Sequence, residues 1–162
     1  MADFLTWVEG SALGETVRGL GVWSYGVFNL VHILGIATLF GSILIVDLRL
    51  LGAWRRIPLR SIATPALPLA VVGFGVAVLS GACMISANAI DYIGNPFLLI
   101  KFPAIALGVL NAIVVAKLPA FRSAWAAQDS VAPEPRVLAI GGGASLLFWL
   151  TAVGSGRLIG YW

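Results

Sequence analysis

The single histidine of this chain, His32, lies inside a long apolar run, and its imidazole offers the widest chemistry in the sequence. Imidazole nitrogens ligate haem iron, copper and zinc, and a polar ring at membrane depth is costly without a partner. Tyr25 and Asn29 fall on the same helical face as His32. We expect this face to turn away from lipid. His32 is then either a ligand or a neutral ring hydrogen-bonded to a group such as Asn111.

Two soft metal ligands, Cys83 and Met84, are adjacent in a later apolar run. Together with His32 they form a donor set that suits copper. The alternative is ordinary packing, because sulfur side chains fill irregular gaps between helices. Cys83 is the only cysteine, so this sequence contains no internal disulfide.

Two cations, Lys101 and Arg157, lie near the outer ends of apolar runs. Each alone would extend its charged end to the lipid headgroups. Beside a haem ligated by His32 near mid-membrane, the same cations could neutralise the propionates. Phe148 and Trp149 could flank the porphyrin, or they could pack in the core or against lipid.

One acidic residue, Asp47, stands at the inner end of the first apolar run. A carboxylate at the negative end of a helix dipole needs a cation nearby. We expect an ion pair with one of the basic residues in reach, and a proton-relay role is the alternative. These basic residues are Arg49, Arg55 and Lys117.

The elements that must position these residues are transmembrane helices. Of the 162 residues, 60% are apolar and only 10% are charged, which indicates a polytopic membrane protein and excludes a soluble domain. A helix of about 20 residues spans a bilayer core. Four runs qualify and leave no room for a second domain, so residues 1–162 form one transmembrane domain. The runs are 20–46, 65–85, 96–118 and 137–159.

Residues 2–18 are too short and too charged to span, and their apolar residues recur at helical spacing, which predicts a helix lying on the outer surface. Pro58 should end the first long helix. Residues 128–135 form a polar, proline-rich loop before the last helix.

Prolines also mark the next two helices. Thr64 should cap a helix that begins at Pro65, and Asn95 one that begins at Pro96. Pro103 lies inside the third run and should bend it.

Most basic residues fall in two connections, which makes that side cytoplasmic. They are Arg49, Arg55, Arg56 and Arg60 in the first connection and Lys117, Arg122 and Arg136 in the third. The fold class is therefore an all-α, up-down four-helix bundle with both termini outside, in the periplasm if the membrane is a bacterial inner membrane. The net charge of +3 follows this topology and forms no nucleic-acid-binding stripe.

Small residues recur four positions apart on several runs, which lets helix backbones approach closely. We interpret them as packing within the bundle, with a homo-oligomer interface as the alternative. They include Ala37 and Gly41; Gly73, Ala77 and Gly81; and Ala139 and Gly143.

Two segments carry a resemblance to known proteins: HILGIATLFGSILIVDLRLLG, which begins at His32, and PFLLIKFPAIALGVLNA, which begins at Pro96. They resemble small bacterial membrane proteins related to the haem-carrying protoporphyrinogen oxidases and the copper-resistance D-type domains. The resemblance covers the first three helices. It implies haem at His32 and a role in activity for Lys101, with Arg49 as a third matching position. The oxidases carry additional histidines, so a second axial ligand here would be Met84 or His32 of a second subunit.

Three functions follow from these observations. The first is a b-type haem protein of the bacterial inner membrane that works in electron transfer, with His32, Asn29, Lys101, Trp149 and Arg157 at the haem. The second is a copper-handling or transport-related protein that uses His32, Cys83 and Met84. The third is a scaffold or accessory subunit of a larger membrane complex with no cofactor. In each, the chain contacts the lipid bilayer and is a homo-oligomer or part of a complex, without nucleic acid.

Overall fold

The computed structural model describes residues 2–127 and 135–162, and these ranges are helical without any strand. The all-α class is therefore confirmed. Most of the predicted loop 128–135 lies outside the described residues. The α-helices are α1 (Ala2–Glu9), α2 (Ala12–Gly19), α3 (Val22–Leu50), α4 (Leu59–Ala87), α5 (Pro96–Lys117), α6 (Pro119–Ala126) and α7 (Arg136–Leu158); the 3₁₀ helices are η1 (Ile90–Tyr92) and η2 (Ile159–Tyr161).

Four of these helices are long and apolar enough to cross a membrane: Trp23–Leu50, Leu59–Ala87, Pro96–Lys117 and Arg136–Tyr161. The shortest has 22 residues, which at about 1.5 Å per residue spans a core of about 30 Å. Many large apolar side chains on them are exposed, as lipid contact requires. The four predicted runs are thus four helices of a multi-pass membrane protein.

The chain divides into two compact units. Unit 1 comprises Met1–Leu39 and Val71–Pro96, and unit 2 comprises Phe40–Ala70 and Phe97–Trp162. Both α3 and α4 contribute residues to each unit. The two functional candidates described below fall in different units.

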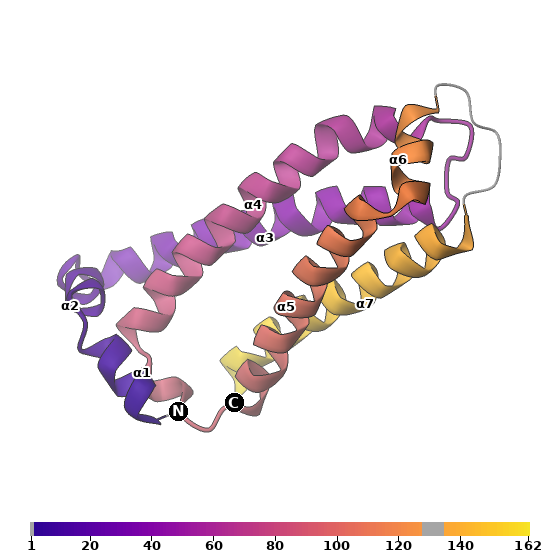
Figure 1. The fold of residues 1–162 in the computed structure, drawn as a ribbon. Coiled ribbons are helices and arrows are strands. Elements are labelled where there is room, and N and C mark those ends of the chain that lie inside the picture. The colour runs from indigo at the N-terminus through magenta and orange to yellow at the C-terminus, as the bar shows by residue number, and fades with distance from the viewer. Residues whose placement is uncertain (1, 128–134) are drawn as a thin grey trace. The chain divides into compact units, whose positions relative to one another are not determined.

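Unit 1 is built on close packing between α3 and α4, which run alongside each other (Figure 1). A Cβ added at Gly73 would lie 2.5 Å from the Leu39 backbone nitrogen, and one at Gly35 would lie 2.8 Å from that of Ala77. Residue numbers rise on one helix as they fall on the other, so this pair is antiparallel. The stripe of Gly73, Ala77 and Gly81 is therefore an internal packing face, as predicted.

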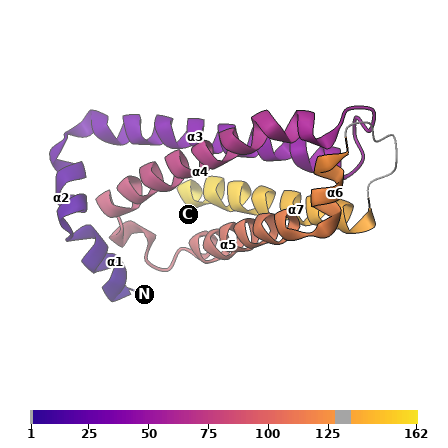
Figure 2. The same ribbon diagram turned by 45° about the horizontal axis from the view of Figure 1, so that its top comes forward.

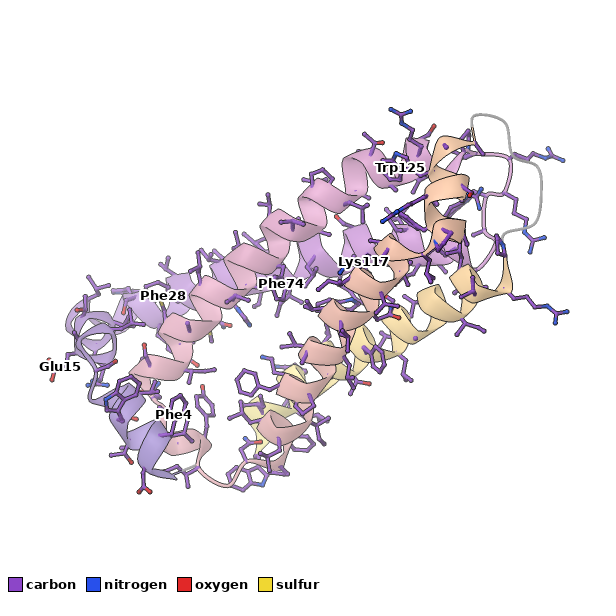
Figure 3. The ribbon with its side chains drawn as sticks, viewed as in Figure 1. Phe4, Glu15, Phe28, Phe74, Lys117 and Trp125 are labelled. Atoms are coloured by element: carbon purple, nitrogen blue, oxygen red, sulfur yellow. The ribbon has the colours of Figure 1, made fainter. Side chains whose placement is uncertain are left out.

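The N-terminal segment of unit 1 is two short helices and not the single helix 2–18 that the sequence predicted. Ser11 ends the first and caps the second, because its hydroxyl accepts a hydrogen bond from the Gly14 backbone N–H. The Arg18 guanidinium donates to the carbonyls of Glu9, Ser86 and Ala87, which ties these helices to the end of α4. Phe4 is exposed on α1, and Glu15 points outward from α2 (Figure 3).

The turn between α3 and α4 differs from the prediction at both ends. α3 ends at Leu50 because Gly52 adopts a φ of 104° and Ala53 N–H bonds to the Leu48 carbonyl, a Schellman ending. Pro58 precedes α4, which begins at Leu59, so Thr64 is not a cap and Pro65 is not the first helical residue. Prolines within membrane helices are tolerated because neighbouring groups satisfy the freed backbone.

The other predicted boundaries agree more closely with the structure. α5 begins at Pro96 and contains Pro103, and α7 begins at Arg136, beside the predicted start at 137. The sequence did not predict α6. Its Trp125 (Figure 3) packs against a buried cluster in unit 2. This cluster comprises Val46, Leu50, Leu59, Ala63, Ala66, Val115 and Leu138.

Helices α5 and α7 lie alongside each other within unit 2 (Figure 2). A Cβ at Gly141 would lie 2.6 Å from Val115 Cγ2, so the glycine admits the valine. The Asn111 side-chain amide donates to the Gly141 carbonyl at 3.0 Å, which adds a polar link between the two helices. The predicted partner of His32, Asn111, is thus engaged with α7.

Candidate functional site

His32 lies in the middle third of α3 and is half-buried against α4 in unit 1. Its Nδ1 atom is 3.1 Å from the hydroxyl oxygen of Ser80, a residue that is 4% exposed. The prediction that His32 has a polar companion is correct, but Ser80 is that companion where we had expected Asn111. Gly81 makes room for the ring, because a Cβ there would lie 2.9 Å from His32 Cε1.

The hydrogen bonds of Ser80 determine which ring nitrogen carries the proton. The Ser80 hydroxyl donates to the Val76 carbonyl, at 2.6 Å, within its own helix. A hydroxyl has one hydrogen, and we assign it to the short contact with Val76, so the Ser80 oxygen accepts from His32. With that assignment Nδ1 carries the proton, and in the neutral ring the lone pair sits on Nε2. Metal-bound histidines show the same arrangement: the ring nitrogen that does not bind the metal donates to an acceptor, which fixes the tautomer.

The other predicted partners of His32 in unit 1 show different burial. Asn29 is exposed and makes no hydrogen bond within the described part of the chain. In a single copy of the chain, the expectation that Asn29 points inward is therefore wrong. Cys83 is a free thiol, and both Cys83 and Met84 are half-buried. They follow Ser80 by three and four residues, so they lie one turn along the same face of α4.

The remaining predicted haem contacts belong to unit 2. Lys101 is half-buried and packs against Gly156. A Cβ added at Gly156 would lie 3.3 Å from the Nζ of Lys101. Trp149 is 5% exposed and packs on Gly108. The Arg157 guanidinium stacks on the Tyr161 ring and donates to its hydroxyl. The structure brings Lys101 and Trp149 into the contact between α5 and α7, and their approach to a haem at His32 stays a prediction.

Asp47 corrects a further expectation. It is 4% exposed, and its side chain hydrogen-bonds to Ser145 of α7. Its Oδ2 atom is buried without a hydrogen-bond partner, and no cation pairs with it among residues 2–127 and 135–162. The predicted ion pair is therefore wrong, because each expected cation is directed elsewhere.

Each of the three cations has a structural reason for its position. Arg49 is fully buried and donates through Nε to the Ile57 carbonyl. It follows Asp47 by two residues, and residues two apart on a helix face different sides. Arg55 folds onto Gly52, where a Cβ would lie 2.6 Å from its guanidinium. Lys117 is exposed at the end of α5 (Figure 3).

Sequence reasoning missed both serines, Ser80 and Ser145. Each is one of several small polar residues in a long, mostly apolar helix, so residue type alone does not single it out. Which helix each serine faces depends on the register between helices. In the described residues no three His, Cys, Asp or Glu side chains gather as a metal site.

The fold and the site define the class: a multi-pass, all-helical membrane protein with polar pairs buried between its spans. A family model for a family of unknown function, DUF6644, matches residues 4–162, so the chain belongs to that family. The comparisons with curated proteins and with solved structures gave no match.

Proposed function

We propose that this chain is a membrane haem protein in which the Nε2 atom of His32 ligates b-type haem iron. The observation that carries the proposal is the hydrogen bond between His32 and Ser80, because it fixes the proton on Nδ1 and the lone pair on Nε2. Haem bound there would supply one-electron chemistry, and the chain would pass electrons between membrane partners.

The chain would supply one imidazole to haem. One histidine per chain would leave any second ligand to Met84, to His32 of a second copy, or to an exogenous group. A methionine and a histidine together form an axial pair that raises the reduction potential of haem. Two histidines would instead make the protein an oligomer with haem between copies.

The proposed topology places both termini outside, in an up-down bundle in a bacterial inner membrane. Its support is the side on which basic residues gather. The connection between α3 and α4 and the start of α4 expose Arg55, Arg56 and Arg60, and α6 exposes Arg122. Arg49, counted among them from the sequence, is buried and contributes no surface charge.

The test is an absorbance spectrum of the full chain, extracted in mild detergent after expression with added haem. Wild type should show a Soret band that disappears in His32→Ala. Ser80→Ala should retain haem with about 10- to 100-fold weaker affinity, because the hydroxyl that accepts from His32 Nδ1 and orients the ring is lost. Colourless, folded wild-type protein would rule out the proposal.

Ser155→Ala is the matched control for Ser80→Ala. Ser155 is 5% exposed and donates to the carbonyl four residues earlier at 2.7 Å, as Ser80 does, but it has no histidine partner. Its substitution should leave haem affinity unchanged. Equal loss in both variants would mean that helix packing, and not the histidine, is responsible.

Copper is the second candidate, because Cys83 and Met84 lie one turn from Ser80 on its face of α4. A soft set of imidazole, thiolate and thioether would favour copper in the cuprous state. Metal analysis of purified protein decides between the candidates. Copper that binds to wild type and is lost in both His32→Ala and Cys83→Ser would replace the haem proposal, whereas folded protein with neither cofactor would favour a scaffold or accessory subunit.

A further inference from the structure

Unit 2 contains a buried acid that the haem proposal does not use. Asp47 is 4% exposed and lies within a span, three residues before α3 ends. Its Oδ2 atom has no hydrogen-bond partner in the part of the chain that the structure describes, while Ser145, itself 5% exposed, holds the side chain by a hydrogen bond. A buried polar atom left unsatisfied costs free energy, so this position needs a specific explanation.

The backbone of Asp47 is tightly packed against α7. A Cβ at Gly142 of α7 would lie 3.0 Å from the Asp47 carbonyl oxygen and 3.1 Å from Leu50 Cβ. The neighbouring residues Val46 and Leu50 belong to the buried apolar cluster of unit 2. The acid therefore sits in a low-dielectric environment that opposes a negative charge.

The charged residues nearby do not pair with Asp47. Arg49, on the same helix, is turned to the Ile57 carbonyl. Helices α4, α5 and α7 share the buried cluster with α3. Their charged residues near this cluster have exposed side chains: Arg60 of α4, Lys117 of α5 and Arg136 of α7. An ionised carboxylate without a counter-ion would be strongly disfavoured here, and an acid in such a position takes up a proton instead.

We propose that Asp47 is a proton-binding site: its Oδ2 carries an exchangeable proton, and the Ser145 hydroxyl holds the carboxyl group in place. Binding adds one proton and removes one negative charge, and release reverses this, so no oxidant or other reactant is needed. A metal cation fits less well, because calcium takes roughly six or more oxygen ligands. Among the described side chains this site shows one carboxyl and one hydroxyl.

Reaction with a hydrophobic carbodiimide tests the proposal in the full chain in lipid nanodiscs. The reagent requires the protonated acid, because the carboxyl proton passes to its nitrogen as the oxygen bonds to its central carbon. We expect one adduct by intact mass at neutral pH, mapped to Asp47 by peptide fragmentation of wild type. Labelling should slow as alkaline pH removes the proton and should be absent in Asp47→Asn.

Asp91→Asn is the matched control, because Asp91 is an exposed acid and its loss should leave labelling unchanged. Peptide mapping of the wild-type adduct keeps the test decisive even if Asp47→Asn fails to fold. An unlabelled wild type, or an adduct mapped elsewhere, would overturn the proposal. Protection by sodium ions at constant pH would also overturn it, since the site would then hold a cation.

Discussion

Helix α3 carries two polar side chains into the interior, one in each unit, and each meets a serine on another helix. In unit 1, His32 meets Ser80, whose own hydrogen is committed to the Val76 carbonyl. In unit 2, Asp47 meets Ser145 and keeps one oxygen without a partner. The first pair orients a neutral ring with a lone pair, which suits a ligand. The second leaves an acid incompletely satisfied, which suits a proton.

The largest expected contrast between the two units is in cofactor binding. His32→Ala should remove the Soret band completely, whereas Asp47→Asn should leave its position and intensity unchanged, since only unit 1 presents an imidazole. Absorbance spectra of the two variants, normalised to folded protein, measure this. A weaker Soret band in Asp47→Asn would show that Asp47 also contributes to haem binding.

Close packing in unit 1 should give the next largest effect. Gly73→Ala should lower the free energy of unfolding by about 1–3 kcal/mol, because the new methyl meets the backbone of Leu39. Gly75, on the same helix, has open space, so Gly75→Ala should be neutral or stabilise by up to about 1 kcal/mol. Denaturation in sodium dodecyl sulfate, followed by circular dichroism, compares them. Equal losses would show that α4 does not pack on α3 through this face.

The corresponding contact in unit 2 is looser. Gly142→Ala should cost about 1 kcal/mol, because its methyl would meet the Asp47 carbonyl and Leu50 at 3.0 Å or more. Gly154 on the same helix has open space and is the control. The same denaturation measurement applies. If Gly142→Ala lost more unfolding free energy than Gly73→Ala, the helix contact in unit 2 would be the tighter of the two.

The smallest effect concerns η1 in unit 1. Burial raises the pKa of Tyr92, and a hydrogen bond with Tyr25 raises it further. A group whose pKa is raised on folding contributes stability below the unfolded value, about 10 for tyrosine, and this is lost as pH rises through the folded pKa. In a pH titration followed by tyrosinate absorbance, one tyrosine should therefore ionise at a higher pH than the others. This step should be absent in Tyr92→Phe. A titration curve of the same shape in both proteins would contradict this.

The sequence was informative where local chemistry decides the structure. Four apolar runs predicted four long helices, and Asn95 with Pro96 predicted the start of α5. Pro65 misled because helix α4 tolerates it in its interior, and Gly52 ended α3 before Pro58 could. The interfacial segment was expected as one helix, but Ser11 divides it.

The candidate sites depended on contacts between helices, which local patterns do not determine. His32 could be singled out from composition alone, but its partner Ser80 lies 48 residues away and is selected by the register of α3 against α4. Asp47 was expected to pair with a cation by proximity in sequence. Helix geometry turned Arg49 to another side and left a serine from α7 as the partner.

The central claim is that the Ser80 hydroxyl fixes His32 with its proton on Nδ1. Because the chain has one histidine, ¹⁵N-histidine labelling gives a single pair of ring nitrogen resonances. In haem-free protein, at a pH where the ring is neutral, we predict that Nδ1 carries the proton and Nε2 does not, and that this pattern changes in Ser80→Ala. A neutral ring with its proton on Nε2 would contradict the account.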